Sequence, residues 1–158
     1  MPNILVKIPK ASFPAEHRAR LMRSLSDAAA TAEQIPDDPR MRMMTMIVID
    51  EVDSGSYTFG GMDMTMQCLP CIAVVYVPAG VLDATARALY VQLVHEAFRQ
   101  AMPAEEHRKL ISSIMLHDVV DGTWGVNGIV WTLPDFARAA GYRHLQPAGT
   151  GLTTTAGS

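Results

Sequence analysis

The sulfur-containing residues form the most conspicuous chemical cluster in the sequence. Cys68 and Cys71 are separated by two residues, and Met62, Met64 and Met66 come just before them. Closely spaced thiolates and thioethers can select copper(I). One Cys-x-x-Cys is only half of a usual structural zinc site, however, and methionine readily fills irregular cores and oligomer interfaces. We therefore interpret the cluster as packing and expect neither a functional metal nor a cofactor.

The histidines and a pair of aspartates offer weaker catalytic patterns. Asp37 and Asp38 lie between two prolines, where acidic residues more commonly end one element and begin the next. The histidines share no spacing and make no convincing catalytic or metal set: His17, His95, His107, His117 and His144. The chemistry must therefore be sought in how the elements are arranged.

The chain repeats itself. The run PNILV that begins at Pro2 recurs as PCIAV from Pro70, an offset of 68 residues, and at the same offset Leu21 falls on Leu89. Such self-similarity indicates a duplicated structural unit. We assign the first unit to residues 1–66, the second to 67–130, and a C-terminal extension with a flexible tail to 131–158.

Each unit has the order β-α-β. Apolar runs predict strands over 4–8 and 72–77, and apolar residues at three-to-four spacing predict amphipathic helices over 14–34 and 83–102. Asp83 is placed to cap the second helix. Second strands are predicted over 43–52 and 110–120. The fold class is therefore α+β, with two fused β-α-β units forming a four-stranded sheet that carries both helices on one face.

The opposite face of that sheet lacks a covering layer. We expect it to carry Ile4, Val6, Ile72, Val74 and several methionines. Because an exposed apolar patch of this kind favours association, we expect a closed homo-oligomer that packs sheet faces together.

Four features together resemble the fused members of the tautomerase superfamily, which includes 4-oxalocrotonate tautomerase, cis-chloroacrylate dehalogenase and malonate semialdehyde decarboxylase. Met1-Pro2 opens directly into a strand, a β-α-β unit follows, and the units close with an aromatic residue and glycines, as YTFGG from Tyr57 and WGVNG from Trp124. The resemblance covers roughly residues 2–130. It implies the tautomerase fold and a homotrimer.

The resemblance also implies that Met1 is removed and that Pro2 acts as the catalytic acid/base. The pKa of an α-amine, normally about 7.7 to 8, falls toward neutrality on burial or beside cations. A neutral secondary amine could take a proton from a carbon next to a carbonyl and return it elsewhere. The alternative is that Pro2 has only a structural role at the start of the strand. Pro70, which is internal, is expected to be structural.

The cations of the family are not where the resemblance would place them. The carboxylate-binding arginine of the first loop falls on Ser12, and the arginine of the second strand falls on Met46. Arg42 is the best substitute, because it lies four positions before Met46 and an even offset in a strand places both side chains on the same face. Arg40 and Lys10 follow as candidates. The decarboxylase relatives carry near this position an acidic residue that positions water or substrate, so Asp38 is a further candidate for the substrate site. The aromatic side chains of Trp124 and Tyr57 are expected to wall the pocket, although each also suits core packing.

These observations predict a tautomerase-like enzyme that performs keto-enol or 1,3-proton transfer on a small carbonyl acid. Hydration or dehalogenation of an unsaturated acid, decarboxylation of a keto acid, and a non-catalytic binding or scaffold role are the alternatives. The formal net charge of −3 gives no reason to expect nucleic acid or an anionic membrane as partner. With neither a membrane span nor a signal peptide predicted, the protein is expected to be cytoplasmic.

Overall fold

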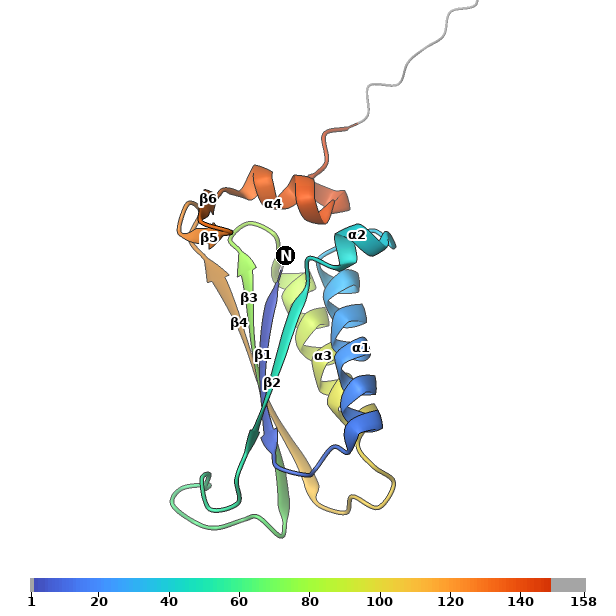
Figure 1. Cartoon of the computed structure of the whole chain (residues 1–158), viewed down its shortest axis with the longest axis vertical. Coiled ribbons are helices and arrows are strands. Elements are labelled where there is room, and N and C mark those ends of the chain that lie inside the picture. Colours follow the sequence, from blue (N-terminus) through green and yellow to red (C-terminus); the bar gives the residue numbers. More distant parts are fainter. Residues whose placement is uncertain (1, 149–158) are drawn as a thin grey trace, which may run out of the picture.

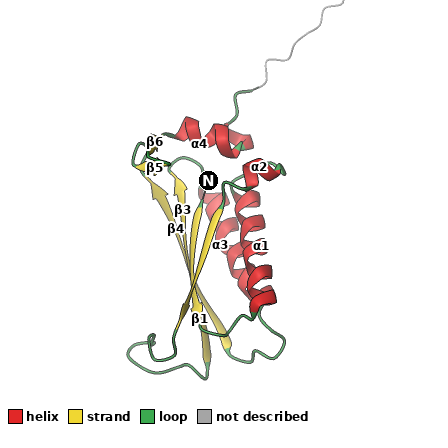
Figure 2. Cartoon of the chain, viewed as in Figure 1, coloured by secondary structure: helices red, strands yellow, loops and turns green. Residues whose placement is uncertain are grey.

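The computed structural model describes residues 2–148 as one four-stranded sheet with two long helices on one face (Figures 1 and 2). Two short strands and three further short helices surround them. The elements in chain order are β1 (Asn3–Pro9), α1 (Ala15–Ala32), α2 (Pro39–Arg42), β2 (Met46–Val52), β3 (Cys68–Pro78), α3 (Ala84–Ala101), β4 (Lys109–Val119), β5 (Trp124–Val126), β6 (Ile129–Trp131), α4 (Leu133–Ala140) and the 3₁₀ turn η1 (Arg143–Leu145).

The sheet confirms the predicted β-α-β order in both units. Its strand order is β2-β1-β3-β4, with β1 parallel to β2, β3 parallel to β4, and β1 antiparallel to β3. The two units therefore meet at β1 and β3, and an approximate two-fold relation exchanges them. Among residues 2–148, no helix is long and apolar enough to cross a membrane.

The two crossover helices bury one stripe each against the sheet. Leu21 and Leu25 of α1, and Val94 and Phe98 of α3, have no exposed surface. Asp83 caps α3 as predicted, since its carboxylate accepts a hydrogen bond of 2.7 Å from the backbone N–H of Ala86. The three-to-four spacing of apolar residues is thus the cause of both helices and of the core between them.

The second strand of the first unit begins later than predicted. Residues 39–42 form the short helix α2, because Asp38 caps it and Pro39 occupies its first turn, where proline is favoured. β2 then begins at Met46 instead of residue 43. Arg42 consequently lies on a helix, and the strand-spacing argument that selected it is wrong.

The uncovered face of the sheet is present, but some residues predicted to form it are not on it. Ile4 and Val6 point toward the helices and are fully buried, because alternate residues of a strand face opposite ways. The apolar residues exposed on the open face come from all four strands: Leu5, Met46, Val48, Ile72 and Met115.

The aromatic-glycine segments close the units as tight turns. In the second unit, β5 and β6 pair through a turn at Asn127 and Gly128, both with positive φ. In the first unit only a single bridge joins Phe59 and Met62. The C-terminal extension then adds α4, which sequence patterns did not predict, and buries Phe136 and Tyr142.

Gly141 is required where α4 ends. Its φ of 67° is left-handed, and a Cβ atom there would clash with the Met41 sulfur. Gly141→Ala is therefore expected to lower the free energy of unfolding by roughly 2 kcal/mol in urea titrations, because alanine is strained at this φ and the flexible end of the Met41 side chain must move. Gly55→Ala is the matched control, since its φ is 87° but the space around it is open, and we expect a loss of only about 1 kcal/mol. Equal losses would contradict the steric argument.

Candidate active site at the amino-terminal end of the sheet

Pro2 is buried at the point where β1 begins. Its carbonyl accepts a hydrogen bond of 3.1 Å from the backbone N–H of Met46, which fixes Pro2 against the start of β2. The proline ring also restricts rotation about its own N–Cα bond. The fold therefore holds the nitrogen of Pro2 in one orientation at one end of the sheet.

Three buried polar side chains gather at this end from different parts of the chain. Glu33 follows the last turn of α1, Tyr90 lies on α3, and Tyr142 follows α4, and none has exposed surface. The Tyr90 hydroxyl donates a hydrogen bond of 2.9 Å to Glu33 Oε1, and the Tyr142 hydroxyl also hydrogen-bonds to the Glu33 carboxyl group. We call these three residues the Glu33 cluster.

The cluster lies beside the amino terminus. Burial raises the pKa of Glu33 to about 7, and the positive charge of the amino terminus, which Met1 carries in the full chain, is the largest of the effects that oppose this rise, ahead of the two tyrosines. Removal of Met1 would move this charge to the nitrogen of Pro2. Burial likewise raises the pKa of Tyr90 and Tyr142, with a further contribution from Glu33. Glu33 is therefore a carboxyl group that titrates near neutrality and lies within electrostatic reach of the chain's amino group.

Trp124 lies at the same end as Pro2. It begins β5 directly beyond the end of β4, and its ring packs against Phe136 of α4 at 5.1 Å between centroids. In the other unit, Tyr57 and Pro70 line one pocket of about 180 Å³. Because Tyr57 and Pro70 are the repeat counterparts of Trp124 and Pro2, the two-fold relation supports the prediction that Trp124 walls the space near Pro2.

Tyr57 and Lys10 lie at the opposite end of the sheet. Lys10 comes eight residues after Pro2, or roughly 25 Å along an extended strand, and its ammonium pairs with Asp53 at 3.2 Å. Tyr57 shares its pocket with Lys7 and Ile8, near the end of β1. Both residues therefore lie too far from Pro2 to belong to the Pro2 site of the same chain.

The remaining predicted residues lie on or near α2. The guanidinium of Arg42 pairs with the carboxylates of Asp27 and Asp37, and Arg42 lines an open cleft of about 330 Å³ together with Arg143. Arg40 is exposed, and its backbone N–H donates to Asp38, the residue that caps the helix. The geometry thus gives Asp38 a capping role and leaves Arg42 and Arg143 as the cations of this cleft.

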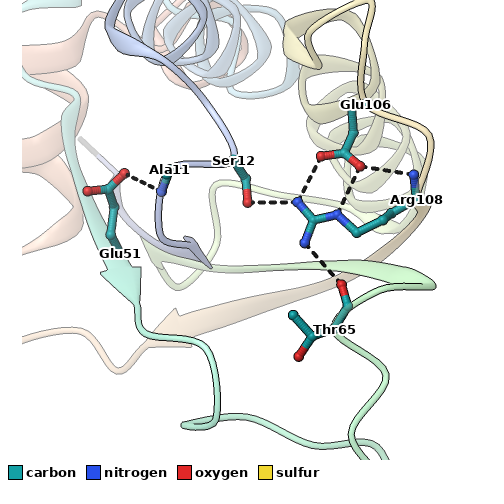
Figure 3. Close-up of polar contacts among 6 residues, drawn as sticks. All are labelled: Ala11, Ser12, Glu51, Thr65, Glu106 and Arg108. Atoms are coloured by element: carbon teal, nitrogen blue, oxygen red, sulfur yellow. Dashed lines mark hydrogen bonds and ion pairs between the residues drawn. The ribbon is translucent and has the colours of Figure 1, made fainter.

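A second polar cluster, which the sequence did not predict, lies at the opposite end (Figure 3). The guanidinium of Arg108 makes two hydrogen bonds to Glu106, at 2.9 and 2.8 Å, and donates to Ser12 Oγ at 3.1 Å and to the Thr65 carbonyl at 3.3 Å. Arg108 thus brings a guanidinium to Ser12, where the resemblance would place an arginine. Because Glu106 already neutralises the guanidinium of Arg108, we interpret this cluster as a structural link between the two units.

The repeat could have revealed Arg108. It lies 68 residues after Arg40, and Glu106 lies 68 residues after Asp38. In both units the acidic side chain accepts a hydrogen bond from the backbone N–H of the arginine, at 2.8 Å for Asp38 and 2.9 Å for Glu106. Glu33 also had a sequence signal, because an acidic residue is unfavourable at the end of a helix and its counterpart in the second unit is Ala101.

The geometry does not support the copper(I) alternative for the sulfur cluster. Cys68 and Cys71 are three residues apart on β3 and so face opposite sides of the sheet. Cys71 is in the core, where burial raises the pKa of its thiol to about 12. Met66 is 82% exposed. Within residues 2–148, no three His, Cys, Asp or Glu side chains are grouped to hold a metal ion.

No protein-family model matches the sequence, and no curated protein sequence matches it. Solved structures do match the fold. A fused 4-OT described as a symmetric trimer aligns at 19% identity over 88% of this chain and 98% of its own, with a TM-score of 0.65. Pt0534, solved after inactivation by 2-oxo-3-pentynoate, aligns at 15% identity over 84% and 97%, with a TM-score of 0.65.

A third similar structure is a member of the cis-3-chloroacrylic acid dehalogenase family. It aligns at 12% identity over 92% of both chains, again with a TM-score of 0.65. All three likenesses extend over nearly the whole length of the known structures, so the complete two-unit arrangement is shared. The chain therefore has the tautomerase fold in its fused form, with two β-α-β units in one polypeptide.

Proposed function

We propose that the protein is a tautomerase-like enzyme in which Pro2, after removal of Met1, is the acid/base catalyst for proton transfer on a small carbonyl acid. The observation that carries this proposal is the placement of Pro2. It is buried directly before β1, its carbonyl is fixed by Met46, and Trp124 and the Glu33 cluster lie at the same end of the sheet.

The proposed reaction conserves protons and electrons. With an enol substrate, the neutral Pro2 nitrogen takes the hydroxyl proton as the carbonyl forms, and the adjacent carbon receives a proton from the resulting ammonium. No bond to a second reactant forms, and no oxidant or reductant is needed. The carboxylate of the substrate would need a cation near Pro2. Arg143 is the better candidate from the cleft that it lines with Arg42, because the guanidinium of Arg42 is already paired with Asp27 and Asp37.

We further propose that the protein is a homo-oligomer, and a trimer by analogy with the fused 4-OT structures described as trimers. The support is the open face of the sheet, where all four strands expose apolar residues. Assembly would cover this surface and would allow Lys10 and Tyr57 of one copy to approach the Pro2 site of another.

Dehalogenation or hydration of an unsaturated acid is the nearest second function. The similarity to a member of the cis-3-chloroacrylic acid dehalogenase family supports this class, and so does a buried carboxyl group near the amino terminus. These reactions need a polarised water as well as a bound carboxylate. Turnover of 3-chloroacrylate in place of enol-keto conversion would favour this function over the first.

The test is enol-keto conversion of phenylenolpyruvate by untagged protein whose intact mass shows whether Met1 is absent. Pro2→Ala is expected to lower kcat/KM by about 100-fold or more, because it replaces the secondary amine and loses the rigid ring. Pro70→Ala is the matched control, since it alters the same position of the repeat where no free amine exists.

We expect Pro70→Ala to leave the rate unchanged. Retained Met1, or equal rates for the Pro2→Ala variant and the unmodified protein, would contradict the proposal and favour a non-catalytic binding or scaffold role.

A further inference from the structure

Glu33 is an ionisable residue in a place where burial is costly. It is fully buried, and it lies at the carboxyl end of α1, where the helix dipole also disfavours negative charge. In the second unit, alanine occupies the corresponding position, so the fold does not require a carboxyl group there. A cost of this kind is typical of a functional site.

The topology explains why Glu33 meets the amino terminus. A crossover helix runs back along the strand that precedes it, so the end of α1 returns to the start of β1 (Figure 1). β3 runs antiparallel to β1 and ends near its start, with Tyr76 opposite Asn3, and α3 begins there with Tyr90 on its second turn. Tyr142 enters from the C-terminal segment.

Two tyrosines and the charge of the amino terminus act on Glu33. The hydroxyls of Tyr90 and Tyr142 bind its carboxyl group, and the amino terminus acts on it by charge. The backbone N–H of Arg143 donates to the carbonyl of Gln34 at 3.0 Å, which secures the C-terminal segment beside the end of α1. The two tyrosines and the C-terminal segment therefore hold the carboxyl group of Glu33 in place.

Resting on the proposed function, we propose that Glu33 is a positioning residue that shares a proton with the Pro2 amine and so sets the protonation state of the catalyst. The two tyrosines hold the Glu33 carboxyl group in place at the end of the sheet where Pro2 lies. As a carboxylate, Glu33 stabilises the ammonium form of Pro2. When the Pro2 amine is neutral, the Glu33 carboxyl group can be the protonated partner of the pair. The amide of Glu33→Gln retains the shape and the hydrogen bonds to tyrosine but cannot carry charge.

The pKa of the Pro2 amine can be measured directly, by the ¹⁵N chemical shift of protein labelled with [¹⁵N]proline as pH is varied. We expect Glu33→Gln to lower this pKa by about one unit or more, because a buried ammonium loses its counter-charge. Tyr90→Phe is expected to give a smaller shift in the same direction, because it favours the neutral form of Glu33. Glu106→Gln, which removes a carboxyl group at the opposite end, is expected to leave the pKa of Pro2 unchanged.

The measurement separates this inference from the proposed function. A lowered pKa of Pro2 in Glu33→Gln supports the inference, even in a protein that proves inactive on phenylenolpyruvate. An unchanged pKa of Pro2 in Glu33→Gln and Tyr90→Phe overturns it, even if activity is lost in Pro2→Ala. If the Glu33→Gln variant is unfolded, Tyr90→Phe alone decides, since it retains the carboxyl group.

Discussion

The Leu5→Glu variant is expected to be a monomer under conditions in which the unmodified protein is an oligomer. Leu5 lies on β1, one of the two central strands, with Val48 and Val74 as its neighbours on β2 and β3. It is 41% exposed in the single chain. In each copy, the substitution would remove about 2 kcal/mol of favourable free energy from apolar burial in the interface. It would also place a charge inside the interface. Sedimentation velocity at several protein concentrations measures the change.

Val120→Glu is the control for Leu5→Glu. Val120 is 68% exposed and lies just beyond β4, outside the paired strands. We expect this variant to retain the assembly, because it adds the same charge at a site that no sheet-to-sheet contact covers. An unmodified protein that is monomeric, or two variants that dissociate equally, would contradict the proposal that the open face is the interface.

Glu33→Gln is expected to stabilise the protein above neutral pH. Burial raises the pKa of Glu33 from 4.5 to about 7, so the folded protein holds a proton that the unfolded chain releases. Its contribution to stability is complete below pH 4.5 and is lost as the pH rises through 7. The unmodified protein should therefore lose about 3 kcal/mol relative to Glu33→Gln between pH 4.5 and pH 8.

Urea unfolding at a series of pH values measures this difference. Glu106→Gln serves as the comparison, because the guanidinium of Arg108 lowers the pKa of Glu106 and the sign of its effect is the opposite. That variant should be less stable than the unmodified protein above pH 4.5, and the difference should disappear as the pH falls below 4.5. A difference between Glu33→Gln and the unmodified protein that does not vary with pH would mean that folding does not change the pKa of Glu33, and would contradict this prediction.

Most of the fold could be predicted from local sequence patterns, and the two errors in that prediction also have local causes. Apolar spacing identified both long helices, and the repeat identified the two β-α-β units. The start of β2 was misplaced because Asp38 and Pro39 form a helix start that reads in sequence as part of a turn. Ile4 and Val6 were assigned to the wrong face because the direction of the alternation in β1 depends on where α1 packs.

The candidate site was less predictable because it is assembled from distant segments. Pro2 was identified by resemblance, and Trp124 by the repeat of the closing segments. Glu33, Tyr90 and Tyr142 lie far apart in the sequence, and they meet because α1 ends and α3 begins at the same end of the sheet. Tyr142 in particular follows α4, a helix of eight residues that no pattern had indicated.

Alkylation by 2-oxo-3-pentynoate, followed by peptide mass mapping, tests the central claim most directly. A neutral Pro2 amine would add to the alkyne, with a new N–C bond to one alkyne carbon and a proton delivered to the other. The account predicts one adduct for each chain, located at an N-terminal peptide that begins with Pro2, together with loss of enol-keto conversion. A peptide that retains Met1, or an adduct located only at another residue, would contradict the assignment of Pro2 as the catalyst.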